Sequence, residues 1–186
     1  MPIAKLIREI VDTTKTGFRE APDGLRPPAS EAKLSVLREA LDGELSDELA
    51  DLLRTHDGED YTATTFLLGG KSWLLPADEI AAERTQLRRL ATASGRLDVL
   101  APEQTHTVGP VKPCHWNSRW IPFYRADSVW AVDMDPDEGG NRGQVINVVW
   151  DDLEVRVEFG CLEEMLAQYL ATLKRGDRRF VAALGS

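Results

Sequence analysis

Cysteine and histidine are scarce in this 186-residue chain, which has two cysteines and three histidines. A disulfide framework or a structural zinc site needs more of these residues at paired spacings. His106, Cys114, His115 and Cys161 match no zinc-ligand pattern. The sequence therefore predicts no metal and no cofactor, and two reduced thiols of the kind found in a cytoplasm.

Basic residues are outnumbered, with 22 lysines and arginines against 31 aspartates and glutamates, which gives a formal net charge of −9. Binding to nucleic acid phosphates without regard to sequence needs clustered basic side chains. We therefore expect no nucleic acid partner. The same negative charge would speed encounters with a basic partner protein.

Long uncharged apolar runs are also missing. Apolar residues do recur near the N-terminus, at Ile3, Leu6, Ile7, Ile10 and Val11, but charged residues interrupt them. This spacing predicts an amphipathic helix over about residues 3–14, without a signal peptide or a membrane span. The expected location is the cytoplasm, with no membrane partner.

No sequence motif of a common enzyme class occurs in the chain. A phosphate-binding P-loop, a dinucleotide-binding glycine pattern, a nucleophile elbow and a metalloprotease helix are all missing. The glycine-rich residues 139–143 lead into an expected strand, whereas an anion-binding loop usually opens a helix. We therefore expect no catalytic residues and no enzymatic activity.

Three aspartates at alternate positions, Asp133, Asp135 and Asp137, suggest a calcium loop of the EF-hand type. The sixth position of such a loop is glycine and the twelfth is glutamate, but this chain has Glu138 and Gln144. We favour a structural role in which backbone amides of the turn hold Asp133 and Asp135. A ligand or substrate site at this turn is the weaker alternative.

The most informative segment is residues 120–145, WIPFYRADSVWAVDMDPDEGGNRGQV. It starts with an aromatic and proline corner, continues as an alternating apolar run, and ends in a turn rich in aspartate and glycine. This order predicts a strand that runs into an acidic turn and then a second strand. Its signature residues are Trp120, Pro122, Asp133, Asp135, Pro136, Gly139 and Gly143.

These residues resemble the SUKH superfamily, which contains the fungal Smi/Knr regulators of cell-wall assembly and many bacterial immunity proteins against polymorphic toxins. Four further segments share the resemblance: PPASE at 27–31, LSDELADLLRTHDG at 45–58, LLPADEI at 74–80, and VKP at 111–113 ahead of Trp116 and Asn117. The resemblance covers roughly residues 25–175. It departs at Gly160-Cys161-Leu162, where such proteins usually carry a Ser-Phe pair before the closing helix.

The sequence shows no regular alternation of strands and helices. Instead, the expected helices lie at both ends of a block of expected strands. This order predicts an α+β fold of the Smi/Knr kind, with a mostly antiparallel or mixed central sheet covered by N-terminal and C-terminal helices. Expected helices cover about 3–14, 30–42, 46–57, 76–95 and 162–173. Expected strands are a pair within 61–75 around Gly69-Gly70, then 129–134, 144–150 and 154–159.

Composition divides the chain into three parts. Residues 1–24 hold the N-terminal amphipathic helix and a linker rich in proline and glycine, residues 25–176 form the SUKH domain, and residues 177–186 are a C-terminal tail. The N-terminal helix has two possible partners, its own domain or another copy of the chain. A homodimer is therefore one candidate assembly.

The resemblance implies a non-catalytic protein-binding domain, most simply an immunity protein that neutralises a cognate toxin such as a basic nuclease. A regulatory or scaffold protein of the Smi/Knr type is the alternative. Tryptophan often anchors interfaces and acidic loops attract basic partners, although core packing and solvated loops are the simpler explanations of the same residues. The candidate partner-binding residues are Trp73, Asp57, Glu59, Asp60, Asp137 and Glu138.

Overall fold

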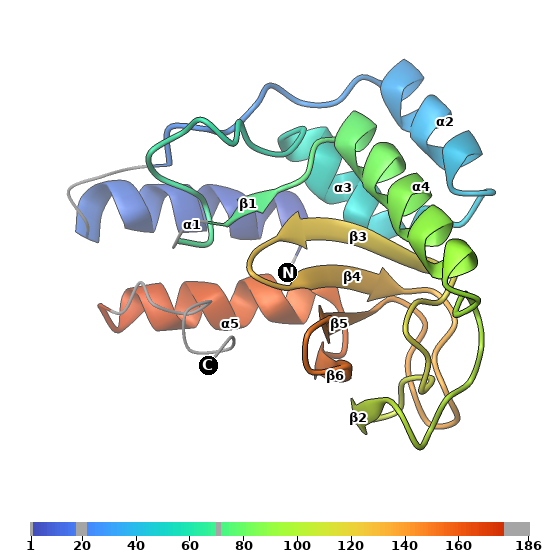
Figure 1. Cartoon of the computed structure of the whole chain (residues 1–186). Coiled ribbons are helices and arrows are strands. Elements are labelled where there is room, and N and C mark those ends of the chain that lie inside the picture. Colours follow the sequence, from blue (N-terminus) through green and yellow to red (C-terminus); the bar gives the residue numbers. More distant parts are fainter. Residues whose placement is uncertain (1, 18–21, 70–71, 177–186) are drawn as a thin grey trace.

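A six-stranded mixed sheet forms the centre of the fold in the computed structural model, which describes residues 2–17, 22–69 and 72–176 (Figure 1). The strand order is β1-β3-β4-β5-β6-β2. The strands are β1 (Trp73–Leu74), β2 (His106–Val108), β3 (Trp120–Arg125), β4 (Val129–Asp133), β5 (Gln144–Val149) and β6 (Glu154–Phe159). The helices are α1 (Ile3–Gly17), α2 (Glu31–Ala40), α3 (Asp47–Thr55), α4 (Ala77–Ala93) and α5 (Leu162–Lys174).

Neighbouring strands pair in antiparallel fashion from β1 through β6, and only β2 runs parallel to its neighbour β6. Together with the flanking helices, this arrangement confirms the predicted α+β fold. The antiparallel hairpins follow from the short connections between β3, β4, β5 and β6, since a parallel pair needs a longer crossover. No helix in the described part of the chain is both long enough and apolar enough to cross a membrane.

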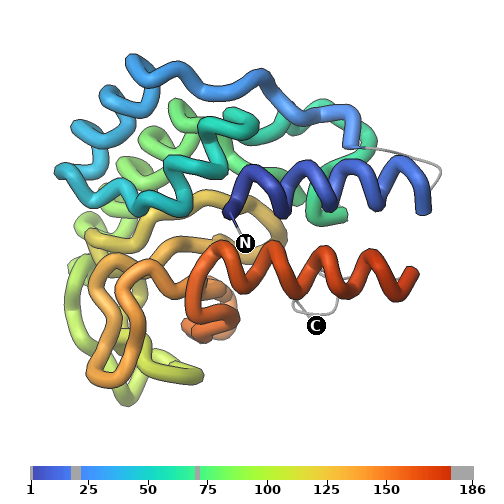
Figure 2. The backbone as a smooth tube through the Cα atoms, turned by 180° about the vertical axis from the view of Figure 1, so that it is seen from behind, coloured from blue at the N-terminus to red at the C-terminus, as the bar shows by residue number. Residues whose placement is uncertain are grey.

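One face of the sheet forms a large core with residues of all five helices. Buried sheet residues such as Phe123, Trp130 and Val132 join the apolar sides of these helices there. The helices α1 and α5 lie side by side in both views (Figures 1 and 2). Leu6 of α1 is fully buried in this core, so the N-terminal helix packs on its own domain. The boundary predicted near residue 24 therefore does not separate two hydrophobic cores.

The opposite face of the sheet forms a second, smaller core. Its centre is Trp116, whose ring meets Trp120 edge-on at 5.5 Å between centroids and stacks on Trp150 at 6.0 Å. Leu87 and Ala91 of α4 close this core from one side. The irregular segment between α4 and β3 covers the rest, so this segment is part of the folded domain.

Residues 120–125 form strand β3, whereas the sequence predicted an aromatic and proline corner at its start. Pro122 cannot donate a backbone hydrogen bond, which argues against a central strand. The short strand β1 pairs only with Tyr124 and Arg125, so none of the described strands lies beside Pro122 on that side. The pairing of β3 with β4 also shifts register between Pro122 and Tyr124, so the strand tolerates the proline on this side as well.

The strand pair expected within residues 61–75 was wrong in its first half. Residues 61–69 form turns, and only the two-residue strand β1 follows. The amides of Leu67 and Leu74 both donate to the buried carboxylate of Glu59, at 2.6 and 2.9 Å. This carboxylate takes the place of a cross-strand partner for Leu67. Gly70 of the expected turn lies outside the described residues, as do residues 18–21 of the linker and the tail at 177–186.

Serine side chains cap the starts of α2 and α3, which begin close to the predicted positions. Ser30 Oγ accepts a hydrogen bond from the Lys33 amide at 3.2 Å at the start of α2, and Ser46 does the same for α3. At the start of α5, where the SUKH pattern departs, Cys161 occupies the cap position. Its Sγ accepts from the amide of Glu164 at 3.4 Å, so a thiol replaces the usual hydroxyl.

Candidate functional site

The acidic turn between β4 and β5 is tied together by Asp133. This residue is fully buried at the end of β4, and its Oδ1 accepts from the Asp135 amide at 2.8 Å. Its Oδ2 accepts from the side-chain amide of Gln144 at 2.9 Å. Burial raises the pKa of Asp133, and the two donors oppose that shift. The carboxylate therefore stabilises the turn through hydrogen bonds to its two ends.

Asp135 joins the same turn to the segment before β3. Its Oδ2 accepts from Lys112 Nζ at 2.7 Å and from Asn117 Nδ2 at 2.9 Å, and Arg119 lies 3.6 Å from its Oδ1. Burial opposes ionisation, but these donors and charges outweigh it and lower the pKa of Asp135. The side chains that hold Asp135 are a correction to the expected backbone amides, and they come from residues distant in sequence.

The glycines of this turn meet two different requirements. Gly139 and Gly143 adopt positive φ angles of 84° and 95°, which residues other than glycine rarely adopt. Gly140 has no such angle, but a Cβ there would lie 2.6 Å from the Pro110 carbonyl oxygen and 2.7 Å from Pro136 Cβ. The turn thus packs closely against the segment before β3.

The predicted acidic partner-binding residues divide into a buried pair and an exposed group. Asp57 Oδ1 accepts from the Ala77 amide at the start of α4 at 2.9 Å, and its Oδ2 pairs with Lys33. Glu59 holds the two amides already described, and burial raises its pKa to about 7. Both side chains face inward, contrary to the expected solvated acidic loop. Neither is a surface contact in this conformation.

The other four candidate partner-binding residues retain exposed or half-exposed side chains. Asp60 is exposed and accepts from Thr62, whereas Trp73 is half-buried in β1. Asp137 and Glu138 are exposed in the turn after β4. Trp73 pairs with the last residue of β3, whereas the turn follows the β4 residue that pairs with Trp120 at the start of β3. The candidates therefore lie at opposite ends of β3 and do not form one continuous surface.

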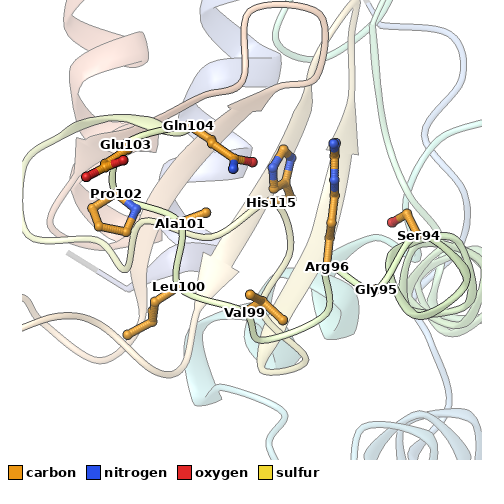
Figure 3. Close-up of a pocket in the computed structure, with 10 residues that line it drawn as sticks. All are labelled: Ser94, Gly95, Arg96, Val99, Leu100, Ala101, Pro102, Glu103, Gln104 and His115. Atoms are coloured by element: carbon orange, nitrogen blue, oxygen red, sulfur yellow. The ribbon is translucent and has the colours of Figure 1, made fainter.

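A cavity of about 540 Å³ lies between the end of α4 and the loop that follows it (Figure 3). Gly95 ends the helix with a φ angle of 68°, and the loop then folds back over the second core. Its backbone is fixed by hydrogen bonds from Asp98 to the Trp116 carbonyl at 3.0 Å and from Ala101 to the Pro113 carbonyl at 2.7 Å. The cavity walls are therefore held in place before any partner binds.

His115 forms part of the wall of this cavity. The residue is 6% exposed, and its Nε2 is shielded from solvent without a hydrogen-bond partner among the residues described. Thr105 Oγ1 and Trp116 Nε1 are in the same state, so this feature does not single out His115. Burial, and then the nearby positive charge of Arg96, lower the pKa of His115, so the imidazole is neutral at neutral pH.

The rest of the cavity combines one cation with an apolar rim. Arg96 is exposed and forms no ion pair within the described ranges, and Figure 3 shows its side chain next to His115. Val99 and Leu100 are 48% and 61% exposed, which is high for large aliphatic side chains. Such a combination can bind an anionic or hydrogen-bonding group beside an apolar one.

Sequence reasoning missed this cavity. It predicted an irregular segment over residues 95–117 with a short apolar element around Leu97 to Leu100, and it favoured a structural or exposed role for His115 over a metal-binding one. Among the described residues, no three His, Cys, Asp or Glu side chains are arranged to hold a metal ion. The available signal was the exposed apolar pair Val99 and Leu100 next to Arg96, but its meaning depends on a fold that brings residue 115 alongside.

Comparison with known protein families gives one clear result. The model of the SMI1 / KNR4 family (SUKH-1) matches residues 28–168, which is most of the chain. The matched range runs from the segment before α2 to within α5 and includes every strand of the sheet. No curated protein matches the sequence. On the strength of the family match, this chain belongs to the SMI1 / KNR4 family (SUKH-1).

Proposed function

We propose that this chain is a non-catalytic protein-binding domain that neutralises a cognate bacterial toxin by direct binding. The observation that carries the proposal is membership of the SMI1 / KNR4 family (SUKH-1), a group that includes many toxin-immunity proteins. We further propose that the chain acts in the cytoplasm, where it meets the toxin before damage occurs. Neither a metal nor a cofactor has a part in this mechanism.

The contacts of the signature residues support a binding role. The Asp133 carboxylate accepts hydrogen bonds within the acidic turn. The Asp135 carboxylate accepts hydrogen bonds from Lys112 and Asn117. Carboxylates engaged in this way stabilise the scaffold, and the surrounding surface is left to vary between relatives. Partner specificity in such proteins resides on surface loops carried by a rigid fold.

The charge of the chain supports a basic toxin as the partner. With a formal net charge of −9, the chain attracts basic proteins over distances of about 8 Å at physiological salt. A nuclease toxin must hold a polyanion, so its active face is rich in lysine and arginine. Complementary charge would raise the association rate and orient the two proteins.

Co-expression tests this function directly. The products of genes beside the one encoding this chain are expressed singly in a bacterial host, and any product that arrests growth is then co-expressed with the chain. Restored growth, together with capture of the toxin on the tagged chain, is the expected result. If the chain binds none of the neighbouring products and restores growth against none of them, the proposal fails.

A scaffold role of the Smi/Knr type is the second candidate, and the name of the matching family favours it. In that role the chain would bring partner proteins together without inhibiting any of them. The same capture experiment separates the two functions. A captured partner that is not toxic, and whose activity is unchanged in the complex, would support the scaffold.

A further inference from the structure

We propose that the cavity beside α4 is a carboxylate-binding subsite that receives an acidic side chain, flanked by an apolar residue, from a protein partner. Arg96, His115 and the pair Val99 and Leu100 form this subsite. That the partner is a toxin rests on the function proposed above. The chemistry of the cavity rests on its own residues and is testable without the toxin.

The positive charge of this subsite comes from Arg96. Most described lysines and arginines of this acidic chain form ion pairs, among them Arg84 with Asp42 and Arg125 with Glu83. Arg96 forms none with the residues described, although it lines a cavity whose walls are fixed. A guanidinium group binds a carboxylate through two parallel hydrogen bonds, with more geometric specificity than an ammonium group provides. A carboxylate is therefore the natural complement.

His115 forms the wall of the cavity beside this cation. Its ring is more than nine-tenths buried and borders the cavity, while its Nε2 atom is shielded from solvent. The ring therefore shapes the cationic end, and Arg96 supplies the hydrogen bonds to a bound carboxylate. Figure 3 shows the His115 ring and the Arg96 side chain next to each other, so a group bound to Arg96 lies beside the ring.

The acidic member of the lining, Glu103, sets the direction of binding. In Figure 3 it lies toward the far side of the cavity from Arg96, with Gln104 and His115 between them. A carboxylate would be repelled at the Glu103 end and attracted at the Arg96 end. The subsite therefore has a cationic end that an acidic side chain would occupy.

The apolar rim favours a protein as the source of the carboxylate. Leu100 is 61% exposed and Val99 is 48% exposed on the loop that borders the cavity. Covering such side chains contributes about 25 cal/mol for each square ångström of apolar area removed from water. A free small carboxylate has no apolar group to cover the rim, whereas a peptide with adjacent acidic and apolar residues has one.

Nuclear magnetic resonance titration of the full chain tests the chemistry. The probes are the capped peptides acetyl-Leu-Glu-Leu-amide and acetyl-Leu-Gln-Leu-amide, together with N-acetylglutamate, which lacks neighbouring apolar residues. The Glu peptide should shift the signals of Arg96, Leu100 and His115 and bind at least about tenfold more tightly than the Gln peptide. Equal binding of the Glu and Gln peptides, or no shift at these residues, would overturn the carboxylate assignment.

Variants separate the cavity from general electrostatic attraction. Arg96→Gln should reduce binding of the Glu peptide to the level of the Gln peptide. Arg89→Gln, which removes an exposed arginine of α4 that does not line the cavity, should leave the affinity unchanged. An equal loss in both variants would contradict a specific subsite. N-acetylglutamate binding as tightly as the Glu peptide would contradict a protein source.

The toxin assay then tests the biological use of the subsite. Arg96→Gln should lose toxin capture and growth protection while it keeps the native chemical-shift pattern, and Arg89→Gln should keep both activities. Full protection by Arg96→Gln would overturn the role of the cavity in partner binding. If the wild-type chain captured no toxin, the proposed function would fail, and the peptide titration would still decide the chemistry of the cavity.

Discussion

Asp133 and Gln144 are cross-strand partners on β4 and β5, and the Gln144 side-chain amide donates to the Asp133 carboxylate over 2.9 Å. The same carboxylate accepts the amide of Asp135, so one buried group closes both sides of the acidic turn. Gln144 also donates to the Pro110 carbonyl at 3.0 Å. The pair thus links the turn, the sheet and the segment before β3.

Replacing Asp133 should destabilise the fold strongly. Asp133→Ala leaves the Asp135 amide and one N–H of Gln144 without an acceptor. Each such loss costs about 1–3 kcal/mol, so the free energy of unfolding should fall by about 2–6 kcal/mol. Urea denaturation followed by tryptophan fluorescence measures this change. Glu138→Ala, an exposed side chain in the same turn, should change stability by less than about 0.5 kcal/mol. Equal effects would show that the buried carboxylate does not hold the turn.

A methyl group at Gly140 should not fit. Gly140→Ala places a Cβ within 2.6 Å of the Pro110 carbonyl oxygen, so the turn must move away from the segment before β3. We expect a loss of about 1–3 kcal/mol, as in other overpacked sites. Gly17→Ala is the matched control, because a Cβ at that position would meet no atom of another element within 4 Å and alanine favours helix. Thermal denaturation of both variants distinguishes packing from the general effect of replacing glycine.

Helix α1 should contribute to the stability of the isolated chain. Leu6 is fully buried and packs in the core shared with α5. Leu6→Ala should therefore lower the free energy of unfolding by about 2–5 kcal/mol, whereas Arg8→Ala on the exposed side should be nearly neutral. A loss below about 1 kcal/mol for Leu6→Ala would contradict the packing of α1 on its own domain.

The stability of the fold should depend on pH through Glu59. Burial raises its pKa in the folded state from an ordinary 4.5 to about 7. Between these values the folded state keeps a proton that the unfolded state has lost, so this group stabilises the fold at low pH. Its contribution falls as pH rises from 4.5 to about 7 and then stays constant. The total change is at most roughly 3–4 kcal/mol, because each pKa unit corresponds to about 1.4 kcal/mol.

Comparison with Glu59→Gln isolates this contribution, since glutamine does not titrate. The unfolding free energy of the wild type minus that of the variant should decrease as pH rises through the window, when measured in urea at several pH values. A difference that stays flat, or that increases with pH, would show that the carboxylate is not held in the protonated form. The other carboxylates cancel in this subtraction, apart from any that couple to Glu59.

Local patterns predicted the helices and the later strands well, because those elements depend on periodicity and capping within a few residues. Strand β3 was missed because Pro122 argues against a strand unless the neighbouring strand is short, and the length of β1 is a property of the tertiary fold. Strand β2 was missed for a related reason. Its three residues pair in parallel with β6, almost fifty positions later in the chain.

The candidate site was less predictable than the fold. Acidic residues near glycine usually lie in solvated turns, yet Asp57 and Glu59 are buried because distant amides of Ala77, Leu67 and Leu74 need acceptors. The cavity depends on His115 meeting the loop after α4, which no local pattern specifies. Sequence alone therefore locates the scaffold better than the surface that a partner would contact.

The most direct test of the proposed function is titration of the purified chain into an assay of the toxin encoded beside it. Toxin activity should fall in proportion to added chain and reach its minimum at about one chain per toxin, as expected for tight binding. Raising the salt concentration should slow association, because opposite charges guide the encounter. Full toxin activity in the presence of excess folded chain would contradict the account.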